Sequence, residues 1–208
     1  MAAGHRDPRL DHIVTAAEAG DVCALTFDDG PAGRDTERLL DGLCARGIRA
    51  VFCVVGTQIQ RPDGRATLQR IVRDGHVLAN HSTSFEDMGD WDADRVRADL
   101  EENLRIIADA VGPGVPVPYW RAPNGSWGVT VPVAVELGMR PLGVVNHIGD
   151  WECQDATVLA ERLRDVMRPG SLVLAHDGPT DRGATIDAVL QVVDERLADG
   201  WRFVLPAL

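Results

Sequence analysis

The chain has 208 residues, of which 45% are hydrophobic and 25% are charged, and its formal net charge is −11. This length and composition are ordinary for one globular domain that buries a full core. The acidic balance argues against nucleic acid and against an anionic membrane surface as partners, because both attract basic proteins. No apolar run approaches the length of a membrane span, so we expect no membrane partner.

The amino-terminal stretch and the cysteines indicate the cellular compartment. Residues 1–11 are polar and lack the apolar core of a secretory signal peptide. We treat residues 1–21 as an N-terminal extension and residues 22–208 as the domain. Three of the four cysteines lie in apolar segments and none has C-x-x-C spacing, so we interpret them as small buried hydrophobes in a reducing compartment. They are Cys23, Cys44, Cys53 and Cys153. We therefore expect a cytoplasmic protein, although a trimmed secreted protein would look the same.

The first predicted strand ends in an unusual pair of acids. An apolar run from Val22 to Phe27 is followed directly by Asp28, Asp29 and Gly30. Two adjacent carboxylates repel each other unless a cation or an arginine shares the site. The glycine allows the backbone to turn sharply after them. Alone, this pattern is also that of a strand followed by a simple turn.

Strands and helices then alternate to the end of the chain. Short apolar runs predict seven strands, over 22–28, 49–55, 77–79, 117–120, 141–145, 172–175 and 201–205. Helical spacing of apolar residues predicts helices between them, over 36–46, 65–74, 92–110, 131–137, 157–167 and 185–198. This alternation predicts an α/β fold with a parallel barrel or a wound sheet.

Polar residues follow five of these strands. The carboxyl ends of parallel strands in a barrel converge on one mouth, where catalytic side chains gather. One polar residue at a strand end means little, but five from different strands indicate a site. They are Asp28 with Asp29, His81, Arg121, Asp150 and His176.

These residues lie in motifs that resemble a known family. Five segments occur in the order of the motifs of the polysaccharide deacetylases, the NodB-homology group or carbohydrate esterase family 4: TFDDG at 26–30, NHSTS at 80–84, RAPNG at 121–125, GDW at 149–151 and LAHDG at 174–178. The resemblance runs from about residue 22 to residue 203. It implies a distorted (β/α)7-type barrel with the NodB-homology fold. It also implies metal-dependent removal of acetyl groups, usually from N-acetylglucosamine units.

The resemblance assigns roles at the first three motifs. Asp28 matches the general base that takes a proton from a metal-bound water, and Arg121 matches the arginine that tethers this base. Asp29 and His81 match metal ligands. The implied cofactor is a divalent metal, zinc in the first place, with cobalt or nickel as alternatives. Such a metal lowers the pKa of a bound water toward about 7, which amide hydrolysis at neutral pH requires.

The last motifs complete the implied site. The backbone N–H of Asn124 matches the donor to the oxyanion. Asp150 matches the carboxylate that orients the general acid, His176, because a departing amine must be protonated. Trp151 and Leu174 match residues that line the acetyl pocket.

The resemblance fails at one position. Phe85 stands where the family has its third metal ligand, a histidine, and catalytic zinc usually keeps three protein ligands. Three explanations are open. Glu86 or His147 replaces the missing ligand, or waters or the substrate itself complete a site with two protein ligands, or the metal is lost. In the last case the chain is a binding protein or a non-hydrolytic acid–base enzyme.

The leading interpretation is a deacetylase that acts on linear amides. We expect it to remove an N-acetyl group, in preference to an O-acetyl group, from a sugar, an oligosaccharide or a small molecule that contains an amino sugar. The apparent absence of a signal peptide favours a cytoplasmic oligosaccharide or biosynthetic intermediate over a cell-wall polymer.

Overall fold

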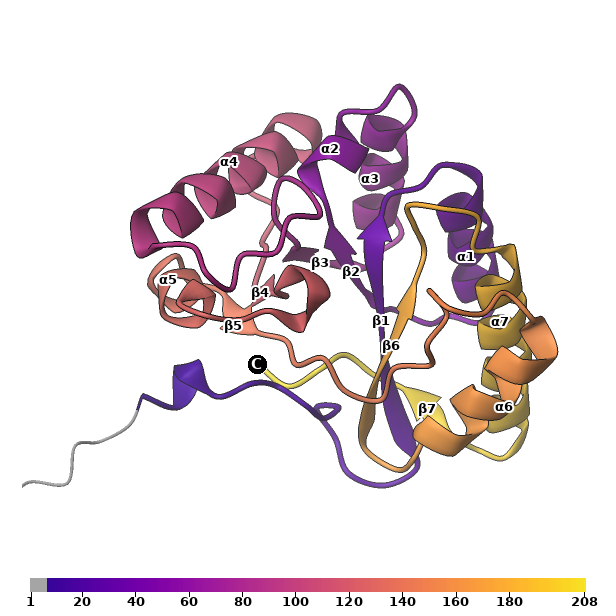
Figure 1. Cartoon of the computed structure of the whole chain (residues 1–208). Helices are drawn as coiled ribbons and strands as arrows, with labels where there is room; N and C mark the ends of the chain where they lie inside the picture. Colours follow the sequence, from indigo (N-terminus) through magenta and orange to yellow (C-terminus); the bar gives the residue numbers. More distant parts are fainter. Residues whose placement is uncertain (1–6) are drawn as a thin grey trace, which may run out of the picture.

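The computed structural model describes residues 7–208, and its centre is one parallel sheet (Figure 1). Seven strands form this sheet in the described part of the chain: β1 (Val22–Gly30), β2 (Val51–Val54), β3 (Val77–Asn80), β4 (Tyr119–Trp120), β5 (Arg140–Pro141), β6 (Ser171–His176) and β7 (Arg202–Phe203). Their order is β5-β4-β3-β2-β1-β6, and β7 pairs with β1 outside this path. All seven strands predicted from the sequence are present.

Helices connect the strands, as parallel strands require. The described residues form α1 (Arg34–Ala45), α2 (Gly56–Ile59), α3 (Gly64–Arg73), α4 (Ala93–Val111), α5 (Thr130–Glu136), α6 (Ala156–Val166) and α7 (Gly183–Ala198). Two short 3₁₀ helices add η1 (Pro8–Leu10) and η2 (Pro123–Gly125). In Figure 1, α1, α6 and α7 lie together beside β1 and β6, and α2 to α5 cover the other strands. The single-turn helix α2 was not predicted, because four residues are too few to show a helical period.

The sheet curls into a half-barrel, which confirms the predicted barrel-type α/β fold (Figure 1). Its open side, between β5 and β6, is bridged by irregular chain. His147 pairs in parallel with Leu174 of β6. The side-chain amide of Asn146 donates to the carbonyl of Leu172 at 2.8 Å. The segment before Asp150 is thereby held against β6.

The predicted strand over 141–145 is too long, and the observed β5 ends at Pro141. The backbone directly after Pro141 forms hydrogen bonds with a side chain and with the chain ahead of β1. The carbonyls of Leu142 and Gly143 accept hydrogen bonds from the side chain of Arg121 at 3.3 and 3.2 Å. The N–H of Gly143 donates to the carbonyl of Ile13 at 2.8 Å. These non-local partners cannot be recognised from local sequence pattern.

Side chains of β1 alternate between two cores, as the two faces of a strand must. Cys23, Leu25 and Phe27 pack with the helices in the larger core cluster. Ala24 lies in a second cluster inside the half-barrel, and Thr26 and Asp28 continue this inward row toward the carboxyl end. The hydrophobic pattern of β1 therefore fixes which of its acids points inward.

Residues ahead of β1 cover the interior cluster. Ile13 and Ala16 are buried there. Ile13 bridges to Leu142, Thr15 bridges to Ser171, and Ala16 bridges to Pro206, so this segment touches chain from three distant regions. It closes the half-barrel on the side that the sheet leaves open.

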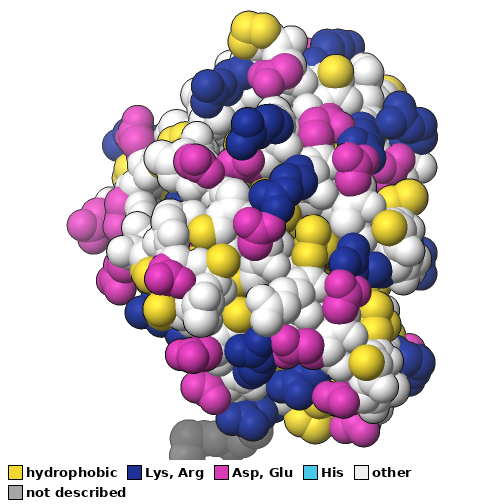
Figure 2. Space-filling view, turned by 90° about the vertical axis from the view of Figure 1, so that its right-hand side faces the viewer, with side chains coloured by type: hydrophobic (Ala, Val, Ile, Leu, Met, Phe, Trp, Pro, Cys, Tyr) yellow, Lys and Arg dark blue, Asp and Glu magenta, His cyan; other side chains and the backbone are white. Residues whose placement is uncertain are grey.

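The surface is charged with both signs interleaved (Figure 2). Every basic side chain is an arginine, since the sequence has no lysine. Several arginines join neighbouring helices: Arg46, directly after α1, pairs with Asp194 of α7 at 2.5 Å, and Arg164 of α6 pairs with Glu195 of α7 at 2.7 Å. Within residues 7–208, no helix is long and apolar enough to cross a bilayer.

The cysteines are free thiols, but only two match the expected burial. Cys23 and Cys53 are buried, Cys153 is half-buried and Cys44 is exposed. The prediction of burial was wrong for Cys44 because it follows the buried Leu43 on α1, and adjacent residues of a helix point about 100° apart.

We expect Leu25→Ala to lower the free energy of unfolding by about 3 kcal/mol, because Leu25 is 2% exposed in the core between β1 and the helices. Urea unfolding measures the change. Leu208→Ala is the control, since Leu208 is 74% exposed. Equal effects of the two substitutions would contradict this assignment of the core.

Candidate active site

The carboxyl end of β1 carries a β-bulge at the paired acids. Asp28 lies opposite Cys53 of β2 and Gly30 lies opposite Val54, so Asp29 is an extra residue without a partner position. Its φ of 76° is in the left-handed region, which is uncommon for a residue other than glycine. Consecutive side chains of a regular strand point to opposite faces. The bulge breaks this alternation, so both carboxylates line the same pocket.

That pocket has a volume of about 530 Å³ and lies at the mouth of the half-barrel. Most of the residues singled out in the sequence line it: Asp28, Asp29, His81, Asn124, His147, Trp151, Leu174 and His176. Three further lining residues were not anticipated: Ala122, Gly125 and Val144. Arg121 and Asp150 are fully buried behind the pocket wall.

Arg121 holds Asp28 in a buried ion pair. The Nη1 group of Arg121 donates to Oδ1 of Asp28 at 2.7 Å and to the hydroxyl of Thr26 at 2.8 Å. The side chain of Arg121 is 0% exposed and that of Asp28 is 5% exposed. Burial opposes ionisation of Asp28, but the positive charge of Arg121, together with His81 and His176, outweighs it and lowers the pKa of the carboxyl group. Asp28 is therefore held as a carboxylate.

His81 follows β3 and turns one ring nitrogen toward the two acids. Its Nδ1 lies 2.8 Å from the carbonyl oxygen of Arg121, which is the geometry of an Nδ1–H donor. Its Nε2 then faces Oδ1 of Asp29 at 3.4 Å and Oδ2 of Asp28 at 3.9 Å. Burial disfavours the imidazolium, but the two carboxylates outweigh burial and raise the pKa of His81. A ring fixed in this way is typical of a histidine that ligates metal.

Asp29 and His81 fit one side of a cation site. A carboxylate oxygen and an imidazole nitrogen are donors that zinc and similar divalent metals accept. Within residues 7–208, no group of three or more His, Cys, Asp or Glu side chains is arranged to hold a metal. Asp29 and His81 would therefore be the two protein donors to a cation bound here, and both side chains line the pocket.

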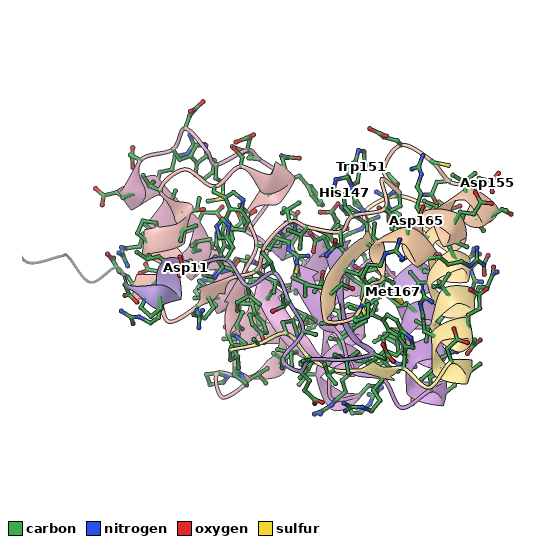
Figure 3. The ribbon with its side chains drawn as sticks, turned by 90° about the horizontal axis from the view of Figure 1, so that it is seen from below. Asp11, His147, Trp151, Asp155, Asp165 and Met167 are labelled. Carbon is green, nitrogen blue, oxygen red and sulfur yellow. The ribbon has the colours of Figure 1, made fainter. Side chains whose placement is uncertain are left out.

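Among the described residues, neither candidate for a third ligand forms a metal-binding group with Asp29 and His81. Glu86 is exposed and pairs with Arg95 at 3.2 Å, so its carboxylate does not line the pocket. His147 lines the pocket, but its ring packs on Trp151 with the ring centroids 4.9 Å apart (Figure 3). Phe85 is 39% exposed, and its carbonyl accepts a hydrogen bond from the side chain of Asn124 at 3.4 Å.

His176 and Asp150 form a second polar pair, one strand away from Asp28. His176 ends β6 and lies opposite Asp28 in the register of β1 and β6. Its Nδ1 lies 2.8 Å from Oδ1 of Asp150, and its backbone N–H donates to Oδ2 of Asp150 at 2.9 Å. Burial lowers the pKa of His176, but Asp150 outweighs burial and the net direction is upward. His176 thus favours the protonated form while Asp28 favours the ionised form.

Trp151 lies beside His176 in the lining of the pocket. The indole is 50% exposed, and its ring lies edge-on to His176 with the centroids 5.5 Å apart. Figure 3 shows His147 and Trp151 next to each other on the irregular chain that leads to α6. Trp151 and the buried Leu174 form an apolar wall of the pocket.

The sequence interpretation missed one buried acid. Asp177 follows His176, is 0% exposed, and accepts a hydrogen bond from the hydroxyl of Thr36 at 2.5 Å. Burial raises its pKa to about 7. A Cβ atom on Gly30 would collide with this carboxyl group, so the glycine is needed for close packing as well as for the turn. The sequence signal that could have identified Asp177 is its position directly after His176, at the end of a predicted strand.

Taken together, the pocket holds an ionised carboxylate and a histidine with pKa values displaced in opposite directions. Such a pair suits general base and general acid catalysis at one centre. Asp29 and His81 lie beside the base with donor atoms available to a cation. This arrangement suits attack of water on a carbonyl carbon followed by protonation of the leaving group.

Comparisons with known proteins agree with this geometry. The sequence profile described as polysaccharide deacetylase matches residues 16–142, more than half of the chain. A chitooligosaccharide deacetylase of Rhizobium leguminosarum bv. trifolii is 30% identical over 182 residues, which cover 81% of this chain and 82% of that protein.

Two solved structures are similar to the whole domain. A family 4 acetyl xylan esterase from Clostridium thermocellum, in complex with a cobalt ion, superposes with a TM-score of 0.78 at 28% identity and covers 88% of this chain and 87% of its own. A peptidoglycan N-acetylglucosamine deacetylase superposes with a TM-score of 0.84 at 24% identity, over 93% of this chain and 89% of its own, and shows the shared fold.

We expect Arg121→Met to destabilise the protein by about 3 kcal/mol at neutral pH, because it leaves the carboxylate of Asp28 buried without its partner. The lowered pKa of Asp28 gives the sign of the pH dependence. Stabilisation by the pair is complete above the ordinary carboxyl value of 3.8 and is lost as the pH falls through the lowered value. The difference between wild type and variant should therefore shrink in acid.

Urea unfolding at several pH values measures this difference. Arg121→Met combined with Asp28→Asn is the control, since it removes the unpaired charge and should recover part of the loss. A penalty that is the same at every pH, with no recovery in the double variant, would contradict the ion-pair account.

Proposed function

Because the chain belongs to the polysaccharide deacetylase family, we propose that it hydrolyses the acetamide group of an N-acetylated sugar and releases acetate and a free amine. One observation supports this most strongly. Asp28, kept ionised by Arg121, lies in the same pocket as His81 and as His176, which Asp150 orients. Amide hydrolysis needs both proton transfers, one from water and one to the amine.

The substrate class follows from relatives and from the pocket. We propose an N-acetylglucosamine-containing oligosaccharide or a smaller amino-sugar compound, by analogy with the chitooligosaccharide deacetylase. The apolar wall of Trp151 and Leu174 suits an acetyl methyl group. An O-acetyl sugar is the second candidate, since the acetyl xylan esterase shares 28% of its residues with this chain. The cytoplasmic location expected from the sequence stays a prediction.

A divalent cation, zinc or alternatively cobalt or nickel, would be held by Asp29 and His81. When bound there, it would lower the pKa of a water ligand and polarise the acetyl carbonyl. The carbonyl of Arg121 fixes the ring of His81 for this purpose. Phe85 has no donor atom in its side chain, so water or substrate would have to supply the other ligands of such a cation.

The side chains of this chain then divide the proton transfers. Asp28 accepts a proton from the attacking water, and Arg121 keeps it ionised before the attack. The backbone N–H of Asn124, in a left-handed residue of the pocket wall with φ of 56°, is the proposed donor to the developing oxyanion. His176 gives its proton to the departing amine, and Asp150 keeps the imidazole oriented.

The alternative function is a metal-free binding protein or a non-hydrolytic acid–base enzyme, and Phe85 is its motivation. The paired acid–base groups favour the hydrolase over a binding protein, because binding alone requires no displaced pKa values. Metal dependence separates the hydrolase from the non-hydrolytic enzyme.

We expect the protein, incubated with tetra-N-acetylchitotetraose and cobalt, to release acetate and an equal amount of free amine. Asp28→Asn should lower kcat at least about 100-fold, because it removes the base while keeping the size of the side chain. Enzymatic acetate determination and mass spectrometry of the sugar measure both products. Glu86→Gln is the control, since Glu86 lies outside the pocket. Full activity of Asp28→Asn, or sugar binding without acetate release by the native protein, would overturn the proposal.

A further inference from the structure

We propose that Arg182 is a positioning residue for the acid half of this site: it fixes the backbone of Asp150 and, through it, the imidazole of His176. This inference rests on the proposed function, because it assigns His176 the protonation of a leaving amine. Arg182 does not line the pocket, so its effect must be indirect.

The carboxylate of Asp150 accepts three hydrogen bonds, which come from two residues. Its carboxylate accepts from both the ring and the backbone of His176, and the hydroxyl of Thr185 donates to Oδ2 at 3.2 Å. It sits on irregular chain that has no strand ladder to fix it. The orientation of His176 therefore depends on whatever fixes the backbone at Asp150.

The carbonyl of Asp150 accepts a hydrogen bond from the side-chain amide of Gln154 at 2.5 Å, and Arg182 adds a second constraint that also reaches another segment. Its Nη1 group donates to the carbonyl of Asp150 at 2.7 Å, and its Nε group donates to the carbonyl of Gly178 at 2.9 Å. The first carbonyl belongs to the residue that orients the acid, and the second lies two residues after the acid itself. The planar guanidinium with its fixed donors holds the two segments at one separation.

Arg182 is itself anchored to the segment that follows β1. Its backbone N–H donates to the carboxylate of Asp35, in the first turn of α1, at 2.7 Å. Arg182 is only 5% exposed. One buried residue thus ties together the chain after the base, the chain after the acid, and the chain that carries Asp150.

The charge of Arg182 acts in the same direction as its hydrogen bonds. A guanidinium buried to this degree is costly unless polar or negative groups surround it. It faces carbonyl oxygens, and its positive charge contributes to the lowered pKa of Asp150. The free energy that burial of Arg182 costs is offset by these hydrogen bonds and by attraction to the ionised Asp150.

Loss of this positioning should affect mainly reactions whose leaving group must be protonated. An amine leaves an amide only after protonation, so hydrolysis of an N-acetyl sugar needs a well-oriented His176. 4-Nitrophenyl acetate releases a stabilised phenolate that needs no proton. Loss of positioning by Arg182 should slow the first reaction far more than the second, whereas general loosening of the fold would slow both.

The experiment compares kcat for tetra-N-acetylchitotetraose and for 4-nitrophenyl acetate in cobalt-loaded protein. We expect Arg182→Ala to lower kcat for the sugar about 100-fold, the usual size of a general-acid contribution, with KM little changed and the ester rate within about threefold. Guanidinium chloride at low millimolar concentration should restore part of the sugar activity by filling the vacated position.

The matched control is Arg196→Ala in α7, the helix that begins directly after Arg182. Arg196 also donates to two carbonyls, those of Arg164 and Met167, but at the far end of the helix from Asp150. It should leave the ratio of sugar to ester rates unchanged and show no rescue by guanidinium. Thr185→Val provides a second variant if Arg182→Ala does not fold, and should shift the ratio in the same direction.

The outcomes separate the two proposals. Equal loss on both substrates in Arg182→Ala and in Thr185→Val, without guanidinium rescue, would overturn the positioning role. A native protein that releases no acetate from the sugar would instead overturn the proposed function. A shifted ratio with rescue supports both.

Discussion

The site depends on the buried ion pair of Arg121 and Asp28. An arginine with no exposed surface is stable only where its donors are used, and this one also bonds Thr26 and two backbone carbonyls. Those bonds hold the end of β1, the end of β4 and the chain after β5 at fixed positions. The same contact keeps Asp28 ionised, and the carbonyl of Arg121 orients His81. Arg121 thus both stabilises the fold and sets the ionisation of Asp28. We therefore expect few substitutions of Arg121 to be tolerated.

A second constraint is the bulge at Asp29. Without it, neighbouring acids would point to opposite faces of the sheet, and only one could reach the mouth. The bulge places Asp29 beside His81 while Asp28 stays in the inward row of β1. The proposed base, Asp28, and the proposed cation ligands, Asp29 and His81, thereby become neighbours. The proposed acid, His176, is brought in by parallel pairing of β6 with β1, so the ends of β3, β1 and β6 supply the proposed reactive groups, with β2 lying between β3 and β1.

The sequence predicted much of this arrangement, because hydrophobic periodicity locates strands and strand ends locate polar side chains. Asp28, His81 and His176 follow from that rule. What it could not predict depends on contacts between distant segments: the short β5, whose following backbone bonds Arg121, and the role of Arg182, whose partners lie on loops. The replacement of the third ligand by Phe85 also could not be interpreted from the sequence, because Glu86 is adjacent to Phe85 in the chain but its carboxylate pairs with Arg95.

The central claim is that this chain binds a catalytic cation with two protein ligands, next to a base held by Arg121. The most direct measurement is anomalous diffraction from crystals soaked in cobalt. The account predicts one strong peak bonded to a carboxylate oxygen of Asp29 and to Nε2 of His81, with Glu86 still outside the pocket. No peak at saturating cobalt, or a peak with Glu86 or His147 as a third protein ligand, would contradict it.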